Sequence, residues 1–297
     1  MTLRVVYRVS LGLLVTLWPL TGEAQPRIAG YGNLSRITAG KPSVQVDAGA
    51  GVAFHLTGPP DGAPLQTLEV SFSGQKVATL KGGRFQEYIR IELRPDLFWI
   101  ISEYTGGAHC CGKYHFLALP GKGPQLKYLG DTGGHSGSPR PLKDCLRFRE
   151  GRLFFQDLDN RFDYFHESHA GSLLVNLPEK FYELGPQELR VNNLAFKEVF
   201  LEGARKAEGE MQQVLRQRRN RPPAILAEIP GLDFSALNFT DRLGQLLLKR
   251  TLYLLYARQD QEAWDTLVRD VELYYQTSRF LPELKQEILE QLRESPY

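Results

Sequence analysis

The spacing of apolar residues changes partway along the chain, and this change is the strongest constraint on its fold. Between residues 41 and 178, apolar residues alternate with polar ones in short runs separated by glycine and proline, which is typical of antiparallel strands. From Phe196 onward, apolar residues recur three or four positions apart, which indicates amphipathic helices. We therefore expect an α+β chain, with an N-terminal antiparallel all-β domain of short strands followed by a C-terminal helical domain.

The same pattern sets the expected boundaries. In the helical half, Pro222 and Pro223 should end the first helix, because proline cannot continue a helix interior. Later helices are expected from about Asp241 to Arg258, from Gln261 to Thr277 and from Pro282 onward. The expected organisation is a signal peptide over residues 1–24, a linker over 25–40, a β-rich domain over 41–178 and an α-helical domain over 186–297.

The first 24 residues have the three parts of a signal peptide. Arg4 and Arg8 precede an apolar run from Val9 to Leu20, and small residues follow at Gly22 and Ala24. The run is shorter than the roughly 20 residues that cross a bilayer, so we expect cleavage; an uncleaved N-terminal anchor is the alternative. We therefore expect a periplasmic or secreted protein with no transmembrane segment after cleavage.

The charge balance restricts the class of partner. The chain has 36 Lys and Arg against 34 Asp and Glu, a formal net charge of +2. A nearly neutral chain has no general electrostatic attraction for nucleic acid. We expect a protein or another component of the cell envelope as the partner, and no nucleic acid.

Three cysteines form the most unusual chemical feature of the chain. Cys110 and Cys111 are adjacent and follow His109 between glycines, and Cys145 is the third. Adjacent Cα atoms lie ~3.8 Å apart, below the usual disulfide range, so a vicinal bridge would be strained. The flanking glycines would permit its unusual backbone. A bridge from either cysteine to Cys145, and reduced or metal-bound thiols, are the alternatives.

Two groups of residues could bind metal. His109, Cys110, Cys111 and His115 have ligand atoms suited to zinc, but adjacent cysteines lack the two-residue gap of common zinc sites. Asp157, Asp159 and Asp163 resemble the start of a calcium loop, but Arg161 and Phe162 stand where such a loop needs a ligand and a glycine. We therefore expect no cofactor, with zinc and calcium as the weaker predictions.

The segment from Glu103 to Cys111 resembles a family of uncharacterised exported bacterial proteins that carry a Gly-Gly-Ala-His-Cys-Cys signature. An Asp-rich turn at residues 157–163, Tyr164 and the run Ala170-Gly171-Ser172 match further features of that family. The resemblance implies a β-rich exported unit, distantly similar to propeller-blade repeats, and it implies no particular activity. It also favours the vicinal bridge, because the family pattern contains the cysteine pair without Cys145.

Two functional hypotheses follow from these features. The first is an exported, envelope-associated binding or structural protein of unknown ligand, and we favour this non-catalytic role. The alternative is an enzyme that uses a thiol-redox or metal-assisted site at His109, Cys110 and Cys111.

Overall fold

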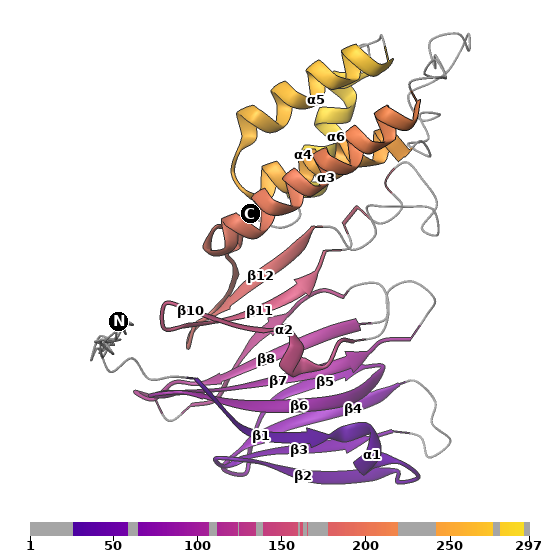
Figure 1. Cartoon of the computed structure of the whole chain (residues 1–297). Helices are drawn as coiled ribbons and strands as arrows, with labels where there is room; N and C mark the ends of the chain where they lie inside the picture. Colours follow the sequence, from indigo (N-terminus) through magenta and orange to yellow (C-terminus); the bar gives the residue numbers. More distant parts are fainter. Residues whose placement is uncertain are drawn as a thin grey trace, which may run out of the picture.

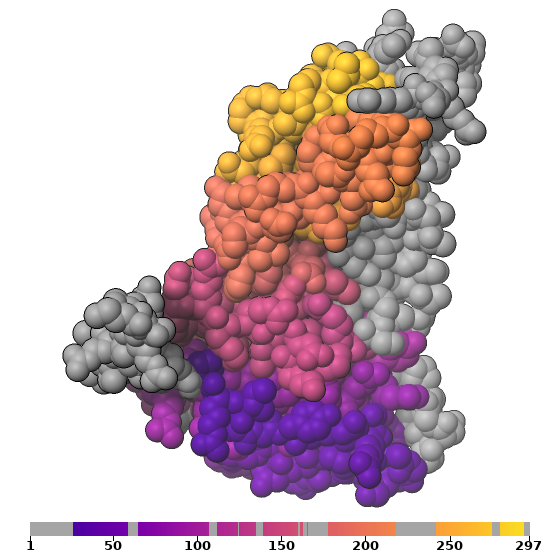
Figure 2. Space-filling view, in the orientation of Figure 1, coloured from indigo at the N-terminus to yellow at the C-terminus, as the bar shows by residue number. Residues whose placement is uncertain are grey.

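The protein is described by a computed structural model. The structure describes residues 26–58, 65–106, 112–123, 125–134, 139–159, 161–162, 165, 178–218, 242–275 and 280–293. Three antiparallel sheets and a layer of helices are stacked one on another (Figure 1). Figure 2 shows the same succession on the surface, from the N-terminal sheets in indigo to the C-terminal helices in yellow.

Each sheet contains a run of consecutive strands. Sheet 1 consists of β2 (Ser43–Gly49), β3 (Val52–Thr57), β4 (Gln66–Phe72) and β5 (Gln75–Gly82). Sheet 2 consists, in spatial order, of β1 (Arg27–Asn33), β6 (Arg84–Leu93), β7 (Asp96–Tyr104), β8 (Gly112–Leu119) and β9 (Lys127–Asp131). Sheet 3 consists of β10 (Leu146–Arg149), β11 (Arg152–Leu158), β12 (Glu179–Leu184) and β13 (Leu189–Val191).

The helices fall into two groups. The short helices α1 (Leu34–Thr38) and α2 (Leu142–Cys145) lie within the β part, and the 3₁₀ helix η2 (Asn193–Phe196) leads out of it. The helical layer consists of α3 (Lys197–Arg218), α4 (Arg242–Tyr256), α5 (Asp260–Tyr275) and α6 (Leu281–Arg293). Among the described residues, no helix combines the length and the hydropathy that crossing a membrane requires.

Sheet 2 is buried on both faces. Successive side chains of a strand point to opposite faces, so Trp99 and Ile101 of β7 join a core with sheet 1. Phe98 and Ile100 of the same strand join a second core with sheet 3. This position explains why residues 97–101 are continuously apolar instead of alternating, since both faces of the strand exclude water.

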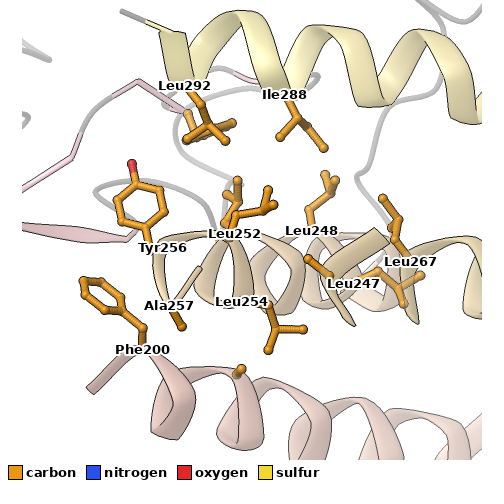
Figure 3. Packing of buried hydrophobic residues seen from close by; sticks show 14 of the residues in the cluster. Phe200, Leu247, Leu248, Leu252, Leu254, Tyr256, Ala257, Leu267, Ile288 and Leu292 are labelled. Atoms are coloured by element: carbon orange, nitrogen blue, oxygen red, sulfur yellow. The ribbon is translucent and has the colours of Figure 1, made fainter. Parts of the chain in front are cut away.

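Sheet 3 joins the β part to the helices. Phe155 on β11 faces sheet 2, whereas Phe154 belongs to the core that the helices form. In that core α4 lies between α6 and α3: Leu248 and Leu252 lie toward α6, and Leu254 faces α3 (Figure 3). Sheet 3 and the helices therefore share a hydrophobic core.

The expected α+β class is confirmed, and two boundaries differ from the prediction. The linker expected over residues 25–40 contains β1 and α1, and β12 and β13 extend the β part to Val191. β1 has no apolar alternation because it is an edge strand, where Ile28 and Tyr31 are 49% and 58% exposed. The described sheets pack face to face, and helices cover the outer face of sheet 3. The propeller-blade likeness that the resemblance implies stays an expectation.

Candidate functional site

The structure places the described candidate residues at three different levels of the stack. His115 lies between sheets 1 and 2, Cys145 and Asp157 lie between sheets 2 and 3, and Asp159 lies where sheet 3 meets the helices. His109, Cys110, Cys111 and Asp163 lie outside the described residues. The described candidates therefore do not form a single site.

His115 forms a buried hydrogen-bonded network with residues of three strands. Its Nε2 lies 2.7 Å from Oε2 of Glu103, and the side chains of His115 and Glu103 are 5% and 4% exposed. Its Nδ1 lies 3.0 Å from the Tyr128 hydroxyl, which donates to Oδ2 of Asp131 at 3.3 Å. Both ring nitrogens of His115 are thus engaged by protein groups.

A close backbone approach holds the Glu103 carboxylate in place. The Gly83 N–H donates to Oε1 of Glu103 at 2.6 Å, and a Cβ added at Gly82 would lie 2.1 Å from the same oxygen. A side chain at position 82 would therefore displace the Glu103 carboxylate. Burial raises the pKa of Glu103, but the hydrogen bonds from His115 and Gly83 lower it further, so that it lies below its usual value.

The network has two proton arrangements, because the Tyr128 hydroxyl has one proton and two neighbouring acceptors. With a protonated ring, Nδ1–H of His115 donates to Tyr128, and Tyr128 donates to Asp131. With a neutral ring that donates to Glu103, Nδ1 accepts the tyrosine proton instead. Asp131 then keeps the Gly133 N–H at 2.8 Å as its donor. In neither arrangement does a ring nitrogen of His115 remain for a metal or a substrate.

The network fixes the base of the segment that carries the His-Cys-Cys sequence. Residues 105–111 connect β7 to β8, and Tyr104 pairs with Gly112 where the two strands end. Gly106, at the start of this connection, has a φ of 80°, a conformation that favours glycine. Because Glu103 and His115 lie on the two flanking strands, their hydrogen bond holds both ends of the connection.

Cys145 is a free, fully buried thiol. Burial raises its pKa to about 11, against the opposing effect of the nearby Arg140 guanidinium. The thiolate is the reactive form of cysteine, so this side chain is inert at neutral pH. A free Cys145 gives no support to the alternative of a bridge from this residue, while the pairing of Cys110 with Cys111 stays a prediction.

Asp159 is the centre of a second buried network, which joins sheet 3 to two helices. Its carboxylate is fully buried, with Oδ2 2.6 Å from Nη2 of Arg161 and Oδ1 3.2 Å from Nζ of Lys180. The Tyr256 hydroxyl at the end of α4 also donates to Oδ2. Burial raises the pKa of Asp159, but Arg161 and Lys180 lower it further, so that it lies below its usual value.

Arg161 extends this network to the last helix. Its Nη1 donates to the main-chain oxygens of Gln291 and Leu292 near the end of α6, at 3.2 and 3.0 Å. Arg161, which interrupts the calcium-loop pattern, thus forms an ion pair with Asp159, two positions earlier in the chain. Arg161 and Lys180 both form ion pairs with the Asp159 carboxylate, which was a candidate calcium ligand. These two cations argue against a metal ion at the same oxygens.

Comparison with known proteins gives one relative at low identity. The chain is 28% identical over 162 residues to a probable thylakoid lumen protein of Synechocystis sp., and the match covers 51% of this chain and 45% of the relative. The chain thus matches less than half the length of that relative. No family model matches the chain, and no solved structure gave a significant match.

Proposed function

We propose that the chain is an exported, non-catalytic binding protein that presents residues 105–111 to a partner outside the cytoplasm. One observation carries the proposal: three candidate groups that the structure describes, His115, Cys145 and Asp159, are buried inside the protein. A group that acts on a substrate must reach it, and these groups are used instead to hold strands and helices together.

The three engaged groups each argue for a structural role. His115 has protein partners at both ring nitrogens, and Asp159 has two cationic partners. Cys145 is a buried thiol whose pKa is raised to about 11. None of these three groups offers an accessible base, ligand or thiolate. The enzyme alternative therefore depends on His109, Cys110 and Cys111 alone, which lie outside the described residues.

Two independent observations support export. Arg4, Arg8 and the apolar run from Val9 to Leu20 have the pattern of a signal peptide. The relative from Synechocystis is named as a probable protein of the thylakoid lumen, a compartment that proteins reach by crossing a membrane. An oxidising compartment would favour a Cys110–Cys111 bridge, which would stiffen the presented segment on its fixed base.

Expression of the full chain in a Gram-negative bacterial host tests this proposal. We expect the protein in the periplasmic fraction, with a new N-terminus near Gln25, because the segment before it has a signal-peptide pattern. Peptide mapping of that fraction under non-reducing conditions should give a Cys110–Cys111 bridge and a free Cys145. A full-length product in the cytoplasm would contradict export, and a bridge to Cys145 would contradict the proposed vicinal bond.

A further inference from the structure

A hollow of about 210 Å³ lies at one end of the pair formed by sheets 1 and 2. Its walls come from α1 and the turn after it, from the C-terminal end of β3 and the residue after it, and from the first residues of β4 and β6. The residues that matter for its chemistry are Ser35, Thr38, Lys41, Thr57, Gln66 and Arg84. The first residue of β6, Arg84, pairs with Tyr104, so the hollow lies beside the base of residues 105–111.

The charge on the described walls has one sign. Lys41 and Arg84 are the charged side chains among these lining residues, and no carboxylate lines the hollow with them. Neither cation has an ion-pair partner within the described part of the chain. The nearest buried acid on the adjoining strand is Glu103, whose carboxylate is already engaged by Gly83 and His115. The described lining therefore carries two positive charges and no negative charge.

The remaining polar groups add both donors and acceptors. Oε1 of Gln66 accepts the Phe85 N–H at 3.0 Å, which leaves the amide N–H groups of Gln66 as donors. The hydroxyl protons of Ser35 and Thr38 are already donated, to Asn33 and to the Leu34 carbonyl. The donors that remain are Lys41, Arg84, the amide of Gln66 and the hydroxyl of Thr57.

We propose that this hollow binds a small oxyanion, a phosphate or a carboxylate, between Lys41 and Arg84. The guanidinium of Arg84 offers the paired donors that match both oxyanions, and Lys41 adds a second charge. The volume lies below the range of about 300–1,000 Å³ for drug-sized ligands, so it suits a small anion. The site does not depend on the proposed role of residues 105–111, and either proposal can fail alone.

Calorimetric titration of the full chain tests the site, with inorganic phosphate in one arm and succinate in the other at constant ionic strength. We expect saturable binding in at least one arm, and the arms distinguish the phosphate from the carboxylate. R84Q and K41Q should each weaken that binding about tenfold or more, because each removes a charge-assisted contact. Both positions are exposed, so the variants should fold, which circular dichroism checks.

K122Q is the matched control. Lys122 is an exposed lysine in the turn that follows β8, at the opposite end of that strand from residues 105–111. Its replacement should leave the affinity unchanged. The absence of saturable binding in both arms, or equal affinity in wild type and R84Q, would overturn the proposal.

Discussion

Replacement of Asp159 by Asn is expected to lower the free energy of unfolding by about 3–5 kcal/mol, the usual cost of removing one partner from a buried ion pair. Asp159 is fully buried, and its loss leaves the cations of Arg161 and Lys180 without their counter-charge. The effect should be large because Arg161 and Tyr256 connect this carboxylate to the ends of α6 and α4. Urea unfolding followed by far-UV circular dichroism measures it.

Glu202→Gln is the matched control for Asp159→Asn. Glu202 pairs with Arg205 on the surface of α3, and the two side chains are 70% and 72% exposed. An exposed pair of this kind contributes less than about 1 kcal/mol. If both variants lost the same stability, the buried network would not be the link between sheet 3 and the helices.

The cost of Asp159→Asn should also depend on pH. The pKa of Asp159 lies below its usual value, so the carboxylate contributes stability above the unfolded pKa of about 3.9. That contribution is lost as the pH falls through the lower pKa of the folded state. The stability difference between wild type and variant should therefore be full at pH 7 and shrink in acid below about pH 4.

Glu103→Ala is expected to cost about 2–5 kcal/mol, because it leaves two buried donors without an acceptor. These donors are Nε2–H of His115 and the main-chain N–H of Gly83. Hydrogen exchange should accelerate at Tyr104 and Gly112, since the strands that flank residues 105–111 lose their shared hydrogen bond. Chemical denaturation and exchange mass spectrometry measure the two effects.

Glu69→Ala provides the comparison for Glu103→Ala. Glu69 lies on β4 at the surface, where it pairs with Lys76 at 2.8 Å. Its removal should leave both the stability and the exchange at Tyr104 unchanged. A change below about 0.5 kcal/mol for Glu103→Ala, the range of ordinary surface substitutions, would contradict the anchoring role of the buried carboxylate.

The class of fold can be predicted from the sequence because the spacing of apolar residues depends only on neighbouring positions in the chain. The end of the α4 helix expected near Arg258 and the start of α6 expected at Pro282 lie within two residues of Tyr256 and Leu281. β1 could not be predicted in the same way, since its exposed Ile28 and Tyr31 and its glycines give no alternation. An edge strand is recognised through its partner, β6, which lies more than fifty residues later.

The two networks could be predicted only in fragments. The sequence shows Arg161 only as a break in the calcium pattern, because its partner Tyr256 lies 95 positions away along the chain. Glu103 lies just before the glycine-rich signature, at the end of an apolar strand. An acidic residue in that position is a signal for a buried, paired carboxylate. Its contact with Gly83, 20 positions earlier, depends on how β6 and β7 pair.

The central claim is that residues 105–111 are presented for binding and do not carry out thiol chemistry. Its most direct test is the rate of alkylation of the mildly reduced, native protein from pH 5 to pH 10, resolved by peptide mass spectrometry. The account predicts that Cys145 reacts only after unfolding, given its pKa of about 11. It also predicts that Cys110 and Cys111 alkylate as ordinary thiols, with rates that rise only above about pH 8. A thiolate at Cys110 or Cys111 that forms below about pH 7 would contradict the account and would favour a redox enzyme.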